Sequence, residues 1–330
     1  MINNVDVVCD LSWGDTGKGK VSAYLAKSGD YKYVARWAGG NNAGHTVYVN
    51  RNKFKTHIIP SGIFYGVKSV IGPGCVINLK SFNEELEYLE SNGFKTSLVK
   101  VSPRAHVVTE EHIALDEEKN SHLGTTGRGI APCYAEKMSR TGTLAGDVLD
   151  KKYLFDTEKM SGNILCEGAQ GFNLDIDWGN YPYVTSSTTL PYGACSLGFS
   201  PKKIRNIWGL AKAYDTRVGE DPFFDSMLSE DEDLTFLQEE GEEFGVTTGR
   251  ARRVNWLNLD ILLKAAIISG TTHIVINKVD VFKKSKQYKA YYNGNLKTFE
   301  SLESYKSFIF NLMFENGIKN IIFSSSKYRI

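Results

Sequence analysis

Residues 5–20 read VDVVCDLSWGDTGKGK, and this stretch decides the fold. The run from Val5 to Cys9 is short and mostly apolar, which is typical of a buried parallel strand. A glycine-rich loop follows at once, and residues 20–27 then carry the apolar spacing of a helix that Gly29 is placed to end. Strand, glycine loop and helix in this order predict a phosphate-binding opening, because backbone N–H groups at a helix N-terminus bind phosphate oxygens.

The loop from Gly14 to Lys20 fits the pattern G-x-x-x-x-G-K. The residue after Lys20 is Val21, whereas ordinary nucleotide-hydrolysing loops carry a Ser or Thr there that binds Mg²⁺. Asp15 lies inside the loop, where a carboxylate would repel phosphate unless it binds Mg²⁺ or takes a proton from a second reactant. We therefore expect a loop that contacts two substrates. A glycine turn with incidental lysines is the alternative.

Short apolar runs recur along the chain, with glycine or charge close to each. They predict buried strands at residues 33–36, 69–72, 163–166, 206–210 and 273–277. Helical periodicity predicts helices at residues 82–89, 257–268 and 308–314, and the acidic stretch 230–243 is typical of a solvated helix. This alternation predicts an α/β fold with a mostly parallel central sheet and the phosphate-binding loop after its first strand. Because no repeat or linker divides the chain, we expect one large domain over residues 1–330.

Length and composition restrict the class of protein. The chain has 330 residues, 42% of them hydrophobic, which is enough for a large core and excludes a peptide hormone or a disordered tail. Lys and Arg number 39 against 38 for Asp and Glu, so we expect no nucleic-acid partner, because phosphate-backbone binding needs a basic surface. The five cysteines are far apart and form no C-x-x-C pair, so we expect reduced thiols. No apolar run approaches the roughly 18 residues of a membrane span, and we expect a soluble cytoplasmic protein without membrane contact.

A second nucleotide motif lies near the end of the chain. Asn277-Lys278-Val279-Asp280 follows an apolar strand and fits N-K-x-D, the element that reads guanine in GTP-binding proteins through the acceptor oxygens of its Asp. Four residues alone also suit a plain turn at a strand end. Together with the phosphate loop, they favour GTP over ATP.

Three other segments are candidates for binding or catalysis. His45 lies among small residues that offer its ring no apolar face, which makes it a candidate for acid or electrostatic work on a phosphoryl group. Residues 247–253 join three guanidinium groups to two hydroxyls, which suits a small dicarboxylate or phosphate, or else a solvated basic edge. Residues 124–129 combine hydroxyls, glycines and one arginine, which suits a nucleotide monophosphate, or else a flexible surface loop.

In order along the chain, these motifs resemble the signature set of the adenylosuccinate synthetase family. The matching segments are residues 13–20, 42–46, 124–132, 167–171, 175–177, 181–187, 216–219 and 247–250, then N-K-x-D and a fainter match at 324–326. The resemblance implies the GTP-binding fold of that family and a carbon–nitrogen ligase that joins L-aspartate to the six-position of IMP. It implies two steps, in which the purine six-oxygen attacks the γ-phosphate of GTP and the aspartate amine then displaces phosphate.

The resemblance also implies a role for individual residues. Asp15 would take the proton of the purine N1, and His45 would stabilise charge on the transferred phosphoryl group. The residues implied for GTP are Gly14, Asp15, Thr16, Gly17, Lys18, Gly19, Lys20, Lys278, Asp280, Ser324 and Ser326. Those implied for the nucleotide monophosphate are Asp15, Asn42, Thr126, Arg140, Gln170, Thr185 and Arg250. Those implied for aspartate are Thr247, Thr248, Arg250 and Arg252, and those for Mg²⁺ are Asp15 and the carbonyl of Gly44. Arg140 would reach into the partner subunit's site, which implies a homodimer.

The sequence departs from the family pattern at several positions. The chain is shorter than the common bacterial form. Asp10 and Ser12 stand where Gly and Gln are usual, Thr16 replaces a customary Glu, Ala251 replaces an Arg, and Ser326 replaces a Gly.

These departures bear on the choice of acceptor nucleotide. A related viral branch uses dGMP, giving N6-succino-2-amino-2′-deoxyadenylate, and often lacks the loop aspartate that is present here as Asp15. We therefore expect IMP, with dGMP or a bifunctional enzyme as the alternative, and we suspect Asp10 and Ser12 of influencing this choice. A GTP-dependent switch is an alternative from another class, but the chain has no D-x-x-G element to sense the γ-phosphate.

Overall fold

The computed structural model describes residues 1–228, 231–245 and 249–330. Within these residues, the central sheet has eight strands: β1 (Ile2–Asp10), β2 (Tyr33–Arg36), β5 (Lys68–Ile71), β7 (Val99–Val101), β9 (Gly162–Glu167), β10 (Ile204–Lys212), β13 (His273–Asn277) and β16 (Asn320–Phe323). Their order is β16-β13-β10-β1-β9-β2-β5-β7, and every neighbouring pair is parallel. The predicted α/β fold with a mostly parallel central sheet is confirmed.

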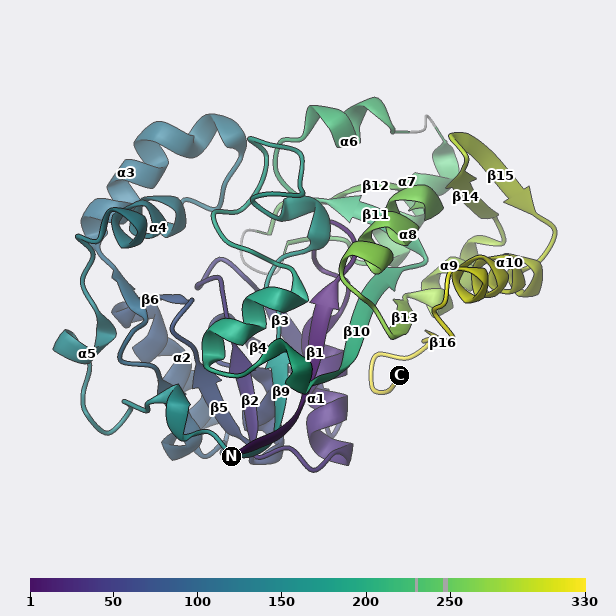
Figure 1. Cartoon of the computed structure of the whole chain (residues 1–330). Coiled ribbons are helices and arrows are strands. Elements are labelled where there is room, and N and C mark those ends of the chain that lie inside the picture. The colour runs from purple at the N-terminus through teal and green to yellow at the C-terminus, as the bar shows by residue number, and fades with distance from the viewer. Residues whose placement is uncertain (229–230, 246–248) are drawn as a thin grey trace.

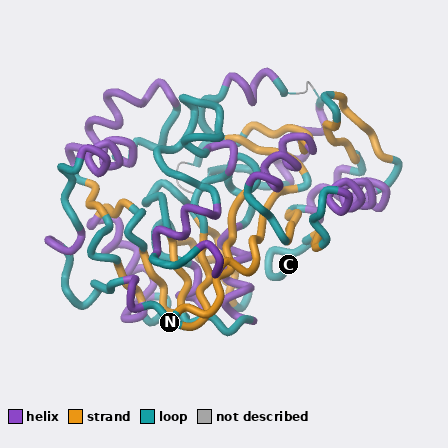
Figure 2. Tube along the Cα trace, in the orientation of Figure 1, coloured by secondary structure: helices purple, strands orange, loops and turns teal. Residues whose placement is uncertain are grey.

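Smaller sheets lie beside the central one. The strands β11 (Tyr214–Arg217), β12 (Arg253–Asn258), β14 (Tyr288–Tyr292) and β15 (Asn295–Phe299) form a second sheet in the order β11-β12-β14-β15. A hairpin joins β3 (His45–Val49) to β4 (Asn52–Thr56), and β6 (Val76–Asn78) pairs in parallel with β8 (His106–Val108). Figure 2 shows the strands of the central sheet gathered in the lower middle of the molecule, with helices around them.

Helices occupy both sides of the sheets. They are α1 (Lys18–Ser28), α2 (Leu79–Ser91), α3 (Glu110–Asn120), α4 (Ile130–Ser139), α5 (Ala145–Val148), α6 (Pro222–Ser226), α7 (Glu232–Glu240), α8 (Leu259–Ile268), α9 (Val279–Ser285) and α10 (Leu302–Glu315). Short 3-10 helices include η1 (Ser61–Tyr65) and η6 (Pro191–Leu197). In Figure 1, α3 and α4 lie together at one end of the molecule, and α10 lies with β14 and β15 at the other.

The first strand is buried on both faces, which explains its apolar sequence. Val5 and Val7 pack on one face in a cluster that includes Leu197 of η6, and Val8 packs on the other face with Val21 of α1. All five side chains are fully removed from water. A parallel strand covered on both faces reads as a continuous apolar run rather than as an alternating one, so β1 forms the centre of the core.

The predicted elements are present, and their bounds differ from prediction by a few residues. Leu257 belongs to β12 rather than to the following helix, and α8 begins after Asn258, whose side chain accepts hydrogen bonds from the backbone N–H groups of Asp260 and Ile261. An N-cap of this kind fixes a helix start that apolar periodicity alone cannot locate.

The prediction that the acidic stretch 230–243 is a solvated helix is wrong in part. Residues 232–240 form α7 as predicted, but Glu243 is completely buried, so the stretch is not solvated throughout. Lys212 and Arg252 lie against the carboxylate of Glu243, and both partners lie outside the acidic stretch. Glu230 lies outside the described residues.

The state of the cysteines and the length of the helices can also be read from the structure. All five cysteines are free, and four of them are buried. Burial raises the pKa of the Cys9 thiol to about 12, with the neighbouring Asp10 carboxylate adding to the effect. In the part of the chain that the structure describes, no helix has the length and apolar character needed to cross a membrane.

Candidate active site

Polar side chains end five neighbouring strands of the central sheet. They are Asn277 of β13, Lys212 of β10, Asp10 of β1, Glu167 of β9 and Arg36 of β2, and all are buried. The carboxyl ends of parallel strands meet at one edge of a sheet, where ligands bind in open α/β folds. These residues therefore form a layer of buried polar and charged groups beneath that edge.

A cavity of about 740 Å³ opens above this edge. The predicted residues that line it are the loop from Gly14 to Lys20, Asn42, Gly44, His45, Thr126, Gln170, Thr185, Arg250, Arg252, Lys278, Asp280 and Ser326. The fold thus brings together segments that are separated by some 300 positions in the sequence.

Two predicted residues within the described part of the chain are not among those that line the cavity. Arg140 ends α4 as an exposed C-cap residue, away from the cavity of its own chain. Ser324 is buried behind the cavity wall and accepts a hydrogen bond from Lys20. Thr247 and Thr248 lie outside the described residues.

The phosphate loop has the backbone that a close turn requires. Gly14 and Gly17 have φ angles of 92° and 95°, and Asp15 has 57°, so all three adopt the left-handed region. A Cβ atom on Gly19 would lie 2.8 Å from the Cβ of His45, so only glycine lets α1 approach the histidine this closely. The loop and His45 therefore face the same part of the cavity.

The two loop lysines have different partners. Lys18 Nζ lies 2.9 Å from Asp10 Oδ2 and is buried. Lys20 Nζ donates to Ser324 Oγ at 2.8 Å and to the carbonyl of Ser326 at 3.0 Å. Burial lowers the pKa of Lys20 to about 8, against the smaller opposite influence of the Asp280 carboxylate. Lys20 thus links the phosphate loop to the C-terminal segment that contains the fainter sequence match.

His45 forms a dyad with Glu167. The Nδ1 atom lies 2.6 Å from Glu167 Oε1, and because a carboxylate only accepts, Nδ1 carries the hydrogen. Arg36 Nη2 lies equally close to Nδ1, but it only donates, so we assign its hydrogen bond to Glu167 Oε1 at 3.1 Å. The other ring atom, Nε2, is buried and has no hydrogen-bond partner among the described residues. In this tautomer Nε2 is therefore the basic nitrogen of the ring.

The charges around His45 favour its neutral form. Burial lowers its pKa to about 4, and Arg36 contributes to the same effect against the opposing charge of Glu167. Burial by itself raises the pKa of Glu167, but His45, Arg36 and the Ser61 N–H outweigh it and hold that pKa at about 2. The carboxylate is therefore ionised at neutral pH and fixes the ring orientation.

A second buried carboxylate, Glu243, binds three side chains, of which Arg252 is a predicted site residue. Glu243 accepts from Tyr214 Oη at 2.7 Å, from Lys212 Nζ at 3.0 Å and from Arg252 Nη1 at 2.5 Å. The Nε atom of the same Arg252 lies 3.0 Å from Asp15 Oδ2. Burial lowers the pKa of Lys212 to about 8, although Glu243 acts in the opposite direction.

The contacts of Glu243 extend to Lys278 of the N-K-x-D motif. Lys278 Nζ lies 3.8 Å from Glu243 Oε1 and donates to the carbonyl of Gly241 at 2.6 Å. The motif's lysine therefore contacts the same buried carboxylate as Arg252. Sequence analysis did not identify Glu243, Lys212 or Arg36 as site residues. Lys212 and Arg36 each place a charge at the end of an apolar strand, and this pattern could have identified them as site residues. The sequence around Glu243 contains no comparable pattern.

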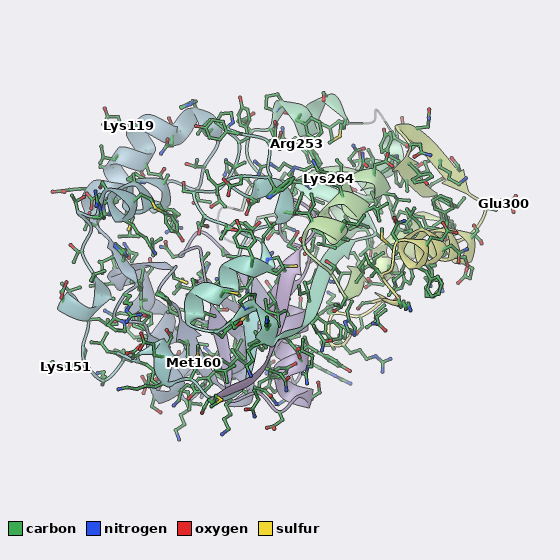
Figure 3. All side chains as sticks on the ribbon, in the orientation of Figure 1. Lys119, Lys151, Met160, Arg253, Lys264 and Glu300 are labelled. Carbon is green, nitrogen blue, oxygen red and sulfur yellow. The ribbon has the colours of Figure 1, made fainter. Side chains whose placement is uncertain are left out.

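The arginines of the arginine-rich segment lie in two different environments. Arg250 Nη2 donates to the carbonyls of Gly124 and Thr125 at 3.0 and 3.4 Å, so this segment meets the glycine-rich loop 124–129. Arg253, labelled in Figure 3, lies beside α6 and pairs with Asp225 instead of lining the cavity. Two of the three guanidinium groups thus belong to the candidate site.

Two amide side chains also line the cavity, those of Gln170 and Asn42. Gln170 has a left-handed φ of 53°, and its Oε1 atom is buried without a hydrogen-bond partner among the described residues. Asn42 Oδ1 accepts from the backbone N–H of Gly40 at 3.2 Å. A buried amide oxygen without a partner loses the free energy of its hydration, so Gln170 is suited to receive a ligand's hydrogen.

The residues fit a magnesium ion bound mainly by substrate. Among the described residues, no three His, Cys, Asp or Glu side chains form a metal cage. Mg²⁺ commonly binds one or two protein oxygens together with phosphates and water. Asp15, whose side chain is about a third exposed in the cavity, and the carbonyl of Gly44 meet that requirement.

We expect Glu167→Gln to lower the free energy of unfolding by about 3–5 kcal/mol, because it leaves the buried Arg36 guanidinium without its counter-charge. The matched control is Glu158→Gln, which removes an exposed partner of Arg104 and should change stability by less than about 1 kcal/mol. Urea unfolding at pH 7 measures both. Equal effects of the two substitutions would contradict the structural role given to Glu167.

Comparison with known proteins was made by sequence and by structure. The sequence matches the family model described as adenylosuccinate synthetase over residues 7–161 and 150–304. The adenylosuccinate synthetase of Clostridium botulinum (strain Langeland) is 41% identical over 334 residues, which cover 83% of this chain and 77% of the relative. That of Brevibacillus brevis (strain 47) is also 41% identical, with 88% and 81% covered.

Two solved structures resemble the fold. The fully ligated adenylosuccinate synthetase of Plasmodium falciparum superposes with a TM-score of 0.85 at 28% identity, covering 98% of each chain. The succinoaminodeoxyadenylate synthetase of cyanophage S-2L, bound to dGMP and to dATP as an energy donor, gives a TM-score of 0.76 at 21% identity. It covers 99% of this chain and 94% of that one, and at this identity the likeness shows the fold alone.

Proposed function

The chain belongs to the adenylosuccinate synthetase family of carbon–nitrogen ligases, as its motifs indicate, and we propose on this premise that it joins L-aspartate to carbon 6 of IMP with hydrolysis of GTP. The observation that carries the proposal is the position of Asp15, within the phosphate loop and 3.0 Å from Arg252 of the arginine-rich segment. A carboxylate between a phosphate loop and an arginine pair suits a reaction with two substrates and has no evident use in a simple GTPase.

The first step forms a phosphorylated nucleotide. Asp15 takes the N1 proton of the purine, the six-oxygen attacks the γ-phosphorus of GTP, and the bond to the β-phosphate oxygen breaks to release GDP. His45 Nε2 faces the transferred group, and the negative charge that accumulates there raises the pKa of the ring, so that a bound proton stabilises it. The Glu167 contact supports this role because it keeps Nδ1 protonated and Nε2 on the reactive side.

The second step forms the carbon–nitrogen bond. The aspartate amine attacks carbon 6, and the phosphate group leaves with the electron pair of the carbon–oxygen bond. We propose that Arg250 and Arg252 bind the two carboxylates of aspartate, together with Thr247 and Thr248. The charge of Glu243 limits the mobility of Arg252, which supports a preformed site for one of these carboxylates.

Magnesium completes the donor site in this proposal. Mg²⁺ bound to the phosphates would neutralise charge that develops on the leaving oxygen. Asp15 and the Gly44 carbonyl are the protein oxygens proposed to hold it. Gly14 to Lys20 would surround the phosphates, and Lys278, Asp280, Ser324 and Ser326 would surround guanine.

The acceptor site supports IMP as the substrate. We propose that Asn42, Thr126, Gln170 and Thr185 hold the monophosphate nucleotide. Asp10 and Ser12, the departures suspected of selecting dGMP, are buried and do not line the cavity, so no contact with an acceptor base supports that alternative. Asp15, the residue that the viral branch often lacks, does line it.

The proposal is tested by phosphate release with GTP, Mg²⁺ and aspartate, comparing IMP with dGMP and identifying the product by mass. We expect release with IMP and a product heavier than IMP by one aspartyl group. Comparable or faster release with dGMP would establish the alternative reaction. Release of phosphate without aspartate or monophosphate would indicate a GTPase and contradict the proposal.

Asp15→Asn is expected to lower kcat at least about 100-fold, because an amide cannot take the N1 proton. Binding of IMP should change much less, since the variant keeps its size and one acceptor oxygen. Steady-state rates and calorimetric binding of IMP measure the two effects. Near-normal turnover of the variant would refute proton removal by Asp15.

Asp280→Asn is expected to lower the preference for GTP over other donors by about 10-fold or more, because the amide keeps only one acceptor oxygen for the guanine N–H groups. The readout is the ratio of kcat/KM for GTP to that for ITP, which lacks the exocyclic amine. A matched control is Asp260→Asn, whose carboxylate binds backbone N–H groups of Asn293 and Gly294 remote from the cavity. An unchanged ratio for Asp280→Asn would refute the assignment.

We also propose a homodimer in which the exposed Arg140 of each subunit reaches the partner's nucleotide site. Arg140→Ala and Asp15→Asn should each be nearly inactive, yet a mixture of the two after subunit exchange should regain about a quarter of normal activity, because half of the dimers are mixed and each mixed dimer has one intact site. Sedimentation measures the assembly. Failure of the mixture to regain activity would refute a shared site.

The five free thiols support a proposed location in a reducing compartment, the cytoplasm.

A further inference from the structure

Asp10 binds most of the phosphate loop without reaching the cavity. It is the last residue of β1 and is 3% exposed. Its Oδ1 accepts from the backbone N–H groups of Ser12 and Gly14 at 2.9 and 3.3 Å. Its Oδ2 accepts from the N–H and hydroxyl of Thr16 at 3.4 and 2.5 Å. One carboxylate therefore fixes every second residue of the loop from position 12 to 16.

The same carboxylate neutralises the first loop lysine. Lys18 Nζ lies 2.9 Å from Asp10 Oδ2, with side-chain exposures of 4% and 0% for the lysine and the aspartate. Loss of one partner of a buried ion pair leaves an uncompensated charge, so the two side chains depend on each other for their positions. Lys18 thus enters the cavity wall in an orientation that Asp10 determines.

Asp10 also controls the backbone of Asp15. Asp15 lies between Gly14 and Thr16, and Asp10 binds the N–H groups of both neighbours. The left-handed φ of 57° at Asp15 is unfavourable for a residue with a Cβ atom, so it persists only where surrounding contacts hold it. Asp10 accepts from the N–H groups on both sides of Asp15, and Asn277 Nδ2 also donates to the carbonyl of Thr16 at 2.6 Å.

We propose that Asp10 is the positioning residue of the phosphate loop. Thr16 stands where a Glu is customary, so the loop itself has no carboxylate at position 16. Asp10 supplies a carboxylate from the end of β1 instead. This carboxylate holds Lys18 and Asp15 in position for binding of the triphosphate. This inference deepens the proposed function and rests on it for the identity of the triphosphate as GTP.

The loop has room for one such carboxylate. Thr16 is 1% exposed, and its hydroxyl lies 2.5 Å from Asp10 Oδ2. A longer acidic side chain at position 16 would bring a second carboxylate against the first, with Lys18 as their shared counter-charge, and like charges repel strongly when buried. Removal of the side chain at position 10 would vacate the space that a glutamate at position 16 needs to reach Lys18. Positions 10 and 16 are therefore coupled.

The test exchanges the carboxylate between the two positions. Asp10→Gly, Thr16→Glu and the double variant are compared for binding of the non-hydrolysable analogue guanosine 5′-(β,γ-imido)triphosphate with Mg²⁺ by calorimetry at pH 7. Each single variant should bind at least about tenfold more weakly, and the double variant should return to within about threefold of the unchanged protein. Asp10→Asn should also weaken binding, because its amide N–H₂ would face either the Lys18 ammonium or backbone N–H donors.

Asp6→Asn is the matched control for a purely structural role. Asp6 lies at the middle of the same strand, four residues before Asp10, is 2% exposed and pairs with Arg205 at 2.6 Å rather than with the phosphate loop. The control should lower the melting temperature and change the affinity for the analogue by less than about twofold. Similar losses of affinity in Asp6→Asn and Asp10→Gly would overturn the inference.

Other outcomes separate the inference from the proposed function. Unchanged affinity in Asp10→Gly, or a double variant that binds no better than the single ones, would overturn the role of Asp10 even if the unchanged protein makes adenylosuccinate. Binding that follows the expected pattern in a protein that releases no phosphate with IMP and aspartate would support Asp10 and overturn the proposed function. A protein that does not bind the analogue would overturn both.

Discussion

The parallel alignment of the central strands is the constraint on which the site depends. Because neighbouring strands run the same way, their carboxyl ends share one edge, and five adjacent strands carry a buried polar residue there. The apolar faces of these strands pack into the core, and the last residue of each of the five strands carries the polar group at this edge. Candidate binding residues between positions 14 and 326 lie together above that edge. Their distance from one another in space depends on the order of the strands in the sheet and not on their separation along the sequence.

Three buried carboxylates organise the cavity wall, and each has a cationic partner. Asp10 pairs with Lys18, Glu167 pairs with Arg36 beside His45, and Glu243 pairs with Lys212 and Arg252. Buried ion pairs contribute little net stability, because desolvation offsets much of their attraction. Their consequence here is geometric, since each pair fixes the orientation of a group that faces the cavity before substrate arrives.

Asp15 is the point at which these systems converge. Its backbone belongs to the loop that Asp10 holds, and its side chain contacts Arg252, which Glu243 holds. In the proposed reaction, a group with two such supports would need little rearrangement when the reactants bind. The same arrangement explains how a carboxylate is tolerated in a phosphate loop, since the guanidinium of Arg252 offsets its charge.

The sequence by itself determined the features that depend on neighbouring residues along the chain. The apolar runs predicted the strands β1, β2, β5, β9, β10 and β13, the glycine spacing predicted the phosphate loop, and the ordered motifs indicated the family. Tertiary structure alone decided the partners of the charged residues. Asp10 was visible as a departure but not as the residue that binds the loop, and Glu243 read as part of a solvated acidic helix. The physical reason is that burial of a charge depends on counter-charges brought by other strands, and a pattern along one segment does not contain that information.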